Sequence, residues 1–418
     1  MSPNPLLNMT PLAGLTLPVF KLQQRALLPL LAALLLAGCL QPPAVEDAPQ
    51  VEPPPAPAVR GQLTDFGDPA LAALAARLRS GGQVTHIVQL GDSHTAADFF
   101  TGSLRESLQE HYGDAGPGWL PPAWIRGQRS ATLKPDGADG KQWLLTSSRL
   151  QEHDNFPLGG FVLESQGEGS RIGLQPYAAD TGSYRWRALY QSGQPASIRV
   201  NGETVVWPAS ARWQWSEPVA TQLPLELVTQ DARPFALGGW MLDRDAPGVL
   251  LSSLGINGAT GSMAWRWGDG WLDSLAALEP RLLILAYGTN EAFNDDLERD
   301  SYYAALSGQL AALRAALPQT VLLLAGAPDA IRYRQEEGCN ARRPRPLAMV
   351  QAVQRQVARE QQTLYWDWQA MMGGRCSFER WQDDNLAQPD GVHLTRAGYE
   401  ASARALYRDL QALLQEQD

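Results

Sequence analysis

Short apolar, β-prone segments alternate with amphipathic helical segments over much of the chain. The β-prone segments lie at residues 85–90, 248–252, 281–287, 321–326 and 363–366. Apolar residues recur at helical spacing in residues 65–79, 301–317, 347–361 and 396–414. Strands that alternate with helices of this length favour a parallel sheet that is covered by helices on both faces. The pattern therefore predicts an α/β fold.

The sequence changes character between about residues 126 and 243. Short β-prone pieces are broken there by Gly, Pro and Asn, and no long helical pattern occurs. We predict a β-sandwich at residues 126–245, inserted between two parts of the α/β domain at residues 61–125 and 246–418. Tryptophans of the insert are candidate platforms for a sugar ring, although most buried tryptophans are core residues: Trp143, Trp186, Trp207, Trp213, Trp215 and Trp240.

The N-terminal residues carry the features of an export signal. Two basic residues precede an apolar run at residues 26–37, which is short for a membrane span but suits a signal peptide. The run ends in Leu-Ala-Gly-Cys39, which resembles a bacterial lipobox, although an ordinary apolar stretch is the alternative. We expect a signal peptide at residues 1–38, lipidation of Cys39, and a Pro-rich tether at residues 39–60.

These features predict a periplasmic protein that a lipid holds to a membrane. By analogy with Gram-negative lipoproteins, Leu40 in place of Asp after Cys39 favours the outer membrane. Cys339 and Cys376 are then the remaining cysteines, and in an oxidising compartment they are a candidate disulfide. Two separate buried thiols are the alternative.

Composition argues against other classes of partner. The chain has 418 residues, 44% of them hydrophobic and 19% charged, which is the profile of a folded globular protein. Its formal net charge is -10 and no dense run of Lys and Arg occurs, so nucleic acid is not an expected partner. With 3 Cys and no paired spacing typical of a zinc site, we expect no metal and no cofactor.

Ser93 is the candidate nucleophile. It lies in Gly91-Asp92-Ser93-His94, directly after a β-prone segment and before residues 95–108, which can continue as a helix. A helix N-terminus favours developing negative charge, so a strand-to-helix turn suits a nucleophile. Asp and Ser also cap helices for purely structural reasons.

Two further motifs offer donors to an oxyanion. Asn290 follows the β-prone segment 281–287, and its side-chain amide can donate a hydrogen bond, although a turn-forming Asn is the alternative. Gly258 follows the segment 248–252 and leaves its backbone N–H unshielded, with Gly255 and Gly261 as close rivals. Each such donor can contribute about 3 kcal/mol to transition-state stabilisation.

Asp390 and His393 complete the candidate site. They lie in Asp390-Gly391-Val392-His393 before the last helical segment. His393 can take the proton of Ser93, while Asp390 holds the other imidazole nitrogen, as a serine hydrolase requires. A spacing of three residues lets one loop deliver both groups.

The order of nucleophile, glycine, asparagine and Asp-x-x-His resembles the SGNH (GDSL-type) hydrolase superfamily. The resemblance implies a flavodoxin-like three-layer fold, a triad of Ser93, Asp390 and His393, and an oxyanion hole made by Ser93, Gly258 and Asn290. His94 stands where the family usually has Leu. With His94 and the insert, the chain resembles the peptidoglycan O-acetylesterases of Gram-negative bacteria. The inserted domain of those enzymes resembles a carbohydrate-binding module.

This closer resemblance implies a serine esterase acting on O-acetylated peptidoglycan. The expected substrate is the 6-O-acetyl group of N-acetylmuramoyl residues, removed through an acetyl-serine intermediate. Two alternatives remain at this point. The first is an O-acetyltransferase, or an esterase acting on another exopolysaccharide or a lipid. The second is a non-catalytic lipoprotein that binds the cell wall.

Overall fold

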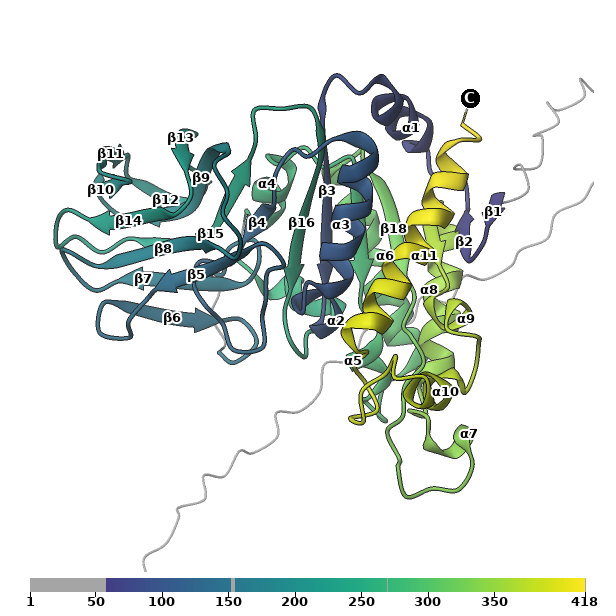
Figure 1. Cartoon of the computed structure of the whole chain (residues 1–418). Coiled ribbons are helices and arrows are strands. Elements are labelled where there is room, and N and C mark those ends of the chain that lie inside the picture. The colour runs from purple at the N-terminus through teal and green to yellow at the C-terminus, as the bar shows by residue number, and fades with distance from the viewer. Residues whose placement is uncertain (1–57, 152–154, 269, 418) are drawn as a thin grey trace, which may run out of the picture. The chain divides into compact units, whose positions relative to one another are not determined.

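A seven-stranded sheet forms the centre of the α/β part (Figure 1). The structure is a computed structural model that describes residues 58–151, 155–268 and 270–417. In sheet order, its strands are β1 (Ala58–Arg60), β2 (Leu63–Asp65), β19 (Leu364–Trp366), β18 (Val321–Ala325), β17 (Leu282–Ala286), β3 (Val84–Gly91) and β16 (Gly248–Gly255). The strands from β19 to β16 are parallel, while β1 and β2 form an antiparallel edge. The predicted α/β fold is confirmed.

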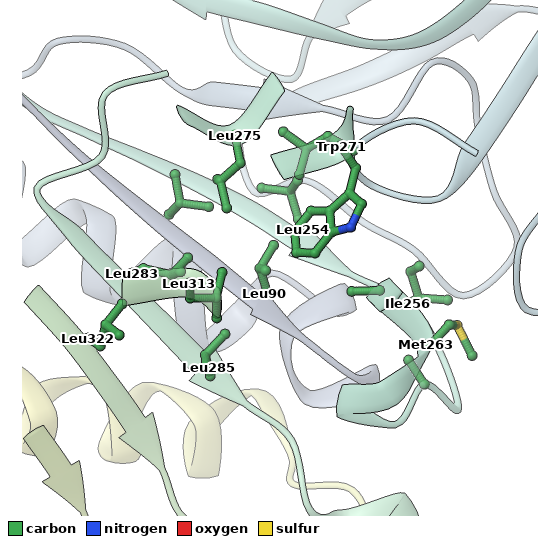
Figure 2. Close-up of a cluster of buried hydrophobic side chains, with 14 of the residues drawn as sticks. Leu90, Leu254, Ile256, Met263, Trp271, Leu275, Leu283, Leu285, Leu313 and Leu322 are labelled. Carbon is green, nitrogen blue, oxygen red and sulfur yellow. The ribbon is translucent and has the colours of Figure 1, made fainter. Parts of the chain in front are cut away.

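Helices cover both faces of this sheet because successive residues of each buried strand enter different cores. On β17, Leu282 and Ile284 join one core, while Leu283 and Leu285 join the other, part of which Figure 2 shows. The first core is covered by α1 (Leu71–Ser80), α3 (Phe99–Tyr112) and α11 (Arg396–Leu414), and the second by α4 (Trp271–Ala276), α6 (Arg299–Ala316) and α8 (Leu347–Glu360). The result is the expected three-layer arrangement.

Short helices occupy the loops of the α/β part. They are α2 (Ser93–Ala96), the 3-10 helix Gly261–Arg266, α5 (Thr289–Ala292), α7 (Cys339–Arg342), α9 (Trp368–Met371) and α10 (Ser377–Asp383). Among the described residues, no helix is both long enough and apolar enough to span a membrane. The expected signal peptide and Cys39 lie outside the described residues.

The α/β part begins differently from the prediction. The helix expected at residues 65–79 starts at Leu71, because the Asp65 side chain accepts the N–H groups of Gly67 and Asp68, both at 2.8 Å, and forms a turn. The expected tether also ends early, since β1 pairs with β2 and starts at Ala58 rather than after residue 60. Residues 95–108 form two helices, separated at Asp98, whose φ is 50°.

The insert consists of two antiparallel sheets that pack face to face around a shared apolar core. One sheet contains β5 (Leu133–Gly137), β8 (Arg171–Pro176), β14 (Leu225–Thr229), β10 (Ala196–Val200) and β11 (Glu203–Trp207). The other contains β6 (Trp143–Ser147), β7 (Phe161–Ser165), β15 (Ala236–Asp243), β9 (Ser183–Ser192), β12 (Ser210–Trp215), β13 (Val219–Gln222) and β4 (Gly118–Leu120). Because β4 pairs with β15, the second sheet takes in residues before the expected boundary at 126.

The tryptophans of the insert are mostly core residues. The buried ones are Trp143, Trp186, Trp207, Trp213 and Trp240. Trp215 is half-buried, and its indole N–H donates to the Ser274 carbonyl in α4 at 3.0 Å. Trp215 thus packs the sandwich against the α/β part. The buried tryptophans are therefore not accessible to a sugar ring.

Candidate active site

Helix α2 starts where the parallel strands β3 and β16 end, and two glycines make room for it. Gly91 and Gly255 are partners across these strands. A Cβ on Gly255 would lie 2.1 Å from the backbone nitrogen of Ala96, and one on Gly91 would lie 2.1 Å from Thr95 Oγ1. Only glycine therefore allows α2 to lie this close to the sheet edge. This packing, rather than an oxyanion contact, explains Gly255.

Ser93 is the first residue of α2, and Asp92 caps that helix. The Asp92 carboxylate oxygen accepts the N–H of His94 at 2.9 Å. Burial raises the pKa of Asp92 to about 8, against the opposing effect of that hydrogen bond. The N–H of Ser93 has no partner within the helix, because it belongs to the first turn. It is therefore available to an anion beside the Ser93 hydroxyl.

The side chains of Ser93, His393 and Asp390 form a continuous chain of hydrogen bonds. His393 Nε2 lies 2.8 Å from Ser93 Oγ, and His393 Nδ1 lies 2.6 Å from Asp390 Oδ2. Partial burial alone would raise the pKa of Asp390. Hydrogen bonds from the backbone N–H groups of His393 and Val392 and from the imidazole outweigh it and lower that pKa. Asp390 is therefore ionised at neutral pH and can stabilise an imidazolium.

The loop that carries Asp390 and His393 is fixed by its backbone. Asp390 Oδ1 accepts the N–H groups of Val392 at 2.9 Å and of His393 at 2.8 Å. Gly391 has a φ of +84°, and a Cβ there would lie 2.5 Å from the Ile331 carbonyl oxygen. Ile331 N–H donates to the Gly391 carbonyl at 2.7 Å. The turn thus places the Asp390 carboxylate and the His393 imidazole next to each other.

A disulfide joins Cys339 and Cys376 in the region that precedes this loop. It connects α7 to the residue before α10. A buried ion pair lies nearby, in which Arg343 Nε donates to Asp329 Oδ1 at 2.7 Å. The other oxygen of Asp329 accepts the N–H of Phe378 in α10 at 3.1 Å. The disulfide and the hydrogen bond from Phe378 to Asp329 therefore hold the same two segments together.

Asn290 contacts residues that neighbour the two other expected oxyanion donors. Its Nδ2 donates to the carbonyl of Ala259, the residue after Gly258, at 2.8 Å, and lies 3.4 Å from Asp92 Oδ2. The second contact is long, so one amide hydrogen is only weakly engaged. The N–H of Gly258 donates no hydrogen bond within the described part of the chain. Asn290 thus contacts Asp92 and Ala259, the residues next to Ser93 and Gly258 in the sequence.

Glu291 was not among the expected site residues, yet it links two of the motifs. One carboxylate oxygen accepts the N–H of Gly261 at 2.7 Å, and the other accepts the N–H of Gly288 at 3.0 Å. The side chain is buried, and burial raises its pKa. An acid three residues after a helix cap is the capping-box signal that could have identified it. Asp92 could have been identified by its cap position in the same way.

His94 points into the core beneath the catalytic loop. Its Nδ1 lies 2.9 Å from the Tyr399 hydroxyl, and its ring centroid lies 5.7 Å from that of His393. Burial lowers the pKa of His94 to about 3, so the ring is neutral at physiological pH. His94 therefore adds no charge to the surroundings of the His393 ring.

The candidate site is open to solvent. The side chains of His393 and Asp390 are 41% and 47% exposed, and Ser93 is half-buried. Ser93 and His393 line neither the cavity of about 730 Å³ beside α3 nor the cavity of about 280 Å³ beside Asn290. No cluster of His, Cys, Asp and Glu suited to a metal occurs among residues 58–151, 155–268 and 270–417.

Comparison with known families and structures matches both parts of the fold. Residues 228–401 match the GDSL-like lipase/acylhydrolase family, and residues 115–226 match the family described as peptidoglycan O-acetylesterase, N-terminal. A solved structure described as "Peptidoglycan O-acetylesterase in action, 5 min" is 34% identical, with a TM-score of 0.78. The match covers 85% of this chain and 100% of that one. This chain belongs to the peptidoglycan O-acetylesterase family.

Other solved structures are less similar to this chain. Protein YxiM from Bacillus subtilis is 14% identical, with a TM-score of 0.34, over 72% of this chain and 97% of that one. The salicylyl-acyltransferase SsfX3 from a tetracycline biosynthetic pathway is 17% identical, with a TM-score of 0.33, over 71% and 97%. No match was found among curated proteins.

The packing of α2 predicts the effect of a single added methyl group. Gly255→Ala should lower the free energy of unfolding by about 1–3 kcal/mol, because the new Cβ meets backbone rather than a movable side chain. Urea denaturation measures this change. Gly308→Ala, at an exposed position in α6 with nothing near its Cβ, is the matched control and should stabilise the helix slightly. Equal stabilities of wild type and Gly255→Ala would contradict this packing.

Proposed function

We propose that this protein is a serine esterase that removes O-acetyl groups from peptidoglycan, with Ser93 as its nucleophile. Its membership of the peptidoglycan O-acetylesterase family supports this substrate class. The observation that carries the proposal is the chain of hydrogen bonds from Ser93 through His393 to Asp390. That arrangement has one well-understood use, which is to activate a hydroxyl for acyl transfer.

The first half of the reaction forms an acetyl-enzyme. Ser93 Oγ attacks the ester carbonyl while His393 Nε2 takes the hydroxyl proton, and Asp390 stabilises the imidazolium that results. The carbonyl oxygen becomes an oxyanion. The backbone N–H groups of Ser93 and Gly258 and the amide of Asn290 are the donors that we assign to it. When the tetrahedral intermediate collapses, the sugar alkoxide leaves with the proton from His393.

The second half regenerates Ser93. Water attacks the carbonyl of the acetyl-serine while His393 takes one of its protons, and the same donors hold the second oxyanion. Collapse breaks the bond to Ser93 Oγ, which recovers its proton from His393, and acetate is released. The charge changes are confined to groups that already lie in contact, so little reorganisation is needed.

The acetyl group on the 6-hydroxyl of N-acetylmuramoyl residues is the substrate position that we propose. That ester lies on a primary carbon that projects from the sugar ring. The exposed triad supports such a substrate, because a polymer can lie across the surface without entering a closed pocket. The same half-reactions would serve an acetyltransferase if a sugar hydroxyl replaced water.

We also propose that the protein is a lipoprotein of the periplasm, held by Cys39 to the outer membrane. This proposal rests on the sequence from the apolar run at residues 26–37 to the Pro-rich segment that follows Cys39. A tether of this composition would let the catalytic part reach glycan strands in the nearby wall.

Ser93→Ala should lower the rate of acetate release from O-acetylated peptidoglycan more than about a hundredfold, because no nucleophile remains. Ser107→Ala removes a hydroxyl from α3 outside the site and should leave the rate unchanged. Acetate release is measured enzymatically, together with any acetyl groups gained by added glycan. Unchanged release in Ser93→Ala would remove Ser93 from the mechanism. Transfer of acetyl to glycan in place of release would identify a transferase.

Asn290→Ala should lower kcat about 10²–10³-fold with a small change in KM, because the lost donor acts mainly on the oxyanion. Asn294→Ala, at an exposed position in the same segment, is the control. Steady-state kinetics with an aryl acetate separate the two parameters. A large rise in KM at constant kcat would indicate that Asn290 binds the ground state instead.

Cys39→Ala should move the protein from the membrane fraction to the soluble periplasmic fraction of a Gram-negative host, because the lipid attachment site is lost. Incorporation of a labelled fatty acid into the wild type, but not into the variant, measures the modification directly. Membrane association and labelling that survive in Cys39→Ala would contradict the lipoprotein proposal.

A further inference from the structure

The sandwich places one of its loops against the oxyanion side of the active site. Ser148, just after β6, is buried, and its hydroxyl accepts the indole N–H of Trp267 at 3.0 Å. The N–H of Ser148 donates to the Gly160 carbonyl at 2.9 Å. Trp267 directly follows the 3-10 helix Gly261–Arg266 of the α/β part. The residue next to Ser148 therefore has a fixed backbone position.

That residue, Arg149, extends its side chain to the oxyanion glycine. A Cβ on Gly258 would lie 2.8 Å from Arg149 Nε and 3.2 Å from Nη2, so the guanidinium rests against the Gly258 backbone. Arg149 is exposed, and its guanidinium forms no ion pair or hydrogen bond within the described residues. Other arginines of the insert and its end do pair with acidic side chains: Arg171, Arg185, Arg233 and Arg244.

Because the Arg149 guanidinium pairs with no acidic side chain among the described residues, it can bind a charged group of the substrate. The chain has a net charge of -10, and the Arg149 side chain places a positive charge against the backbone of Gly258. Guanidinium binds carboxylates through two parallel hydrogen bonds, which fix the orientation of the bound group. Peptidoglycan carries carboxylates on its peptide stems, whereas simple acetylated glycans such as acetylxylan have a neutral backbone.

We propose that Arg149 binds a carboxylate of the substrate, so that the enzyme selects acetyl esters on acidic, peptide-bearing glycan over neutral ones. This inference rests on the proposed function. A direct role at the oxyanion is less consistent with the structure, because none of the described residues fixes the exposed guanidinium by a hydrogen bond or ion pair, and transition-state stabilisation requires preorganised donors. Arg149 is thus a specificity-determining residue that the inserted domain supplies.

Residues 124–128 contact the loop that carries Gly258 and include one exposed aromatic side chain. The Asn257 amide donates to the Arg126 carbonyl at 3.5 Å, and the Gln128 side chain donates to the Gly255 carbonyl. Trp124, in the same segment, is 59% exposed, unlike the buried tryptophans of the sandwich. Exposed indole faces stack on sugar rings, so this segment is compatible with a glycan lying along the loop.

The test compares substrates that differ only in charge. O-acetylated muropeptides and the same muropeptides with their carboxylates converted to methylamides are hydrolysed by wild type and by Arg149→Gln. The variant should raise KM for the acidic muropeptides about tenfold and change kcat/KM for the amidated ones and for 4-nitrophenyl acetate less than twofold. Added NaCl should raise KM for the acidic substrate in the wild type but not in the variant.

Two further variants separate charge from position. Arg149→Lys should restore part of the affinity for acidic muropeptides, because the charge remains while the bidentate geometry is lost. Arg199→Gln removes an exposed arginine from β10, on the other sheet of the sandwich, and should behave like wild type. If Arg149→Gln lowers kcat/KM equally for all three substrates, the proposal is overturned in favour of an oxyanion role. No change on any substrate would overturn it as well.

A failure of the proposed function gives a different result. In that case the wild type hydrolyses 4-nitrophenyl acetate through Ser93 but releases no acetate from muropeptides. Charge recognition is then measured as inhibition of 4-nitrophenyl acetate hydrolysis by acidic muropeptides, which should be about tenfold weaker in Arg149→Gln. Inhibition that is equal in the two proteins, or absent from both, would overturn the role of Arg149.

Discussion

The close approach of helix α2 to the sheet edge is the constraint on which the site depends. Gly91 and Gly255 end two paired parallel strands, and neither position has room for a Cβ. Because α2 lies directly on these strand ends, the Ser93 hydroxyl and the helix N-terminus are presented at the edge where the other motifs also emerge. The 2.8 Å contact between Ser93 and His393 follows from that placement.

Buried carboxyl groups fix the positions of these motifs relative to one another. Asp92 caps α2 and faces Asn290, while Glu291 accepts N–H groups from Gly261 and Gly288. Burial raises the pKa of both acids, because it disfavours their ionised forms. Their hydrogen bonds offset part of that cost and fix the spacing between the nucleophile turn and the oxyanion donors. Asp390, by contrast, is half-exposed and ionised, as its role toward His393 requires.

Much of this arrangement could be predicted from the sequence, because buried parallel strands and the residues that follow them leave strong local signals. The strand ends at Ser93 and Asn290, and the loop with Asp390 and His393, were identified in this way. Asp92 and Glu291 were missed although their cap positions leave a local signal, because their contacts with Asn290 and Gly261 join residues far apart in the sequence. The start of α1 was misplaced because the Asp65 turn competes with helix formation. The contact of Arg149 with Gly258 joins two domains and leaves no trace in local spacing.

The position of the insert in the chain explains why it borders the oxyanion loop. Its two ends lie together, since Arg244 N–H donates to the Ala115 carbonyl at 2.8 Å and Asp114 bridges to Val249. An insert whose ends meet leaves the sheet intact, so β16 still pairs with β3 along its whole length. The chain then runs from the sandwich through β16 into the loop with Gly258. A domain inserted immediately before this strand is therefore well placed to contribute side chains to the site, and Arg149 is the residue that does so.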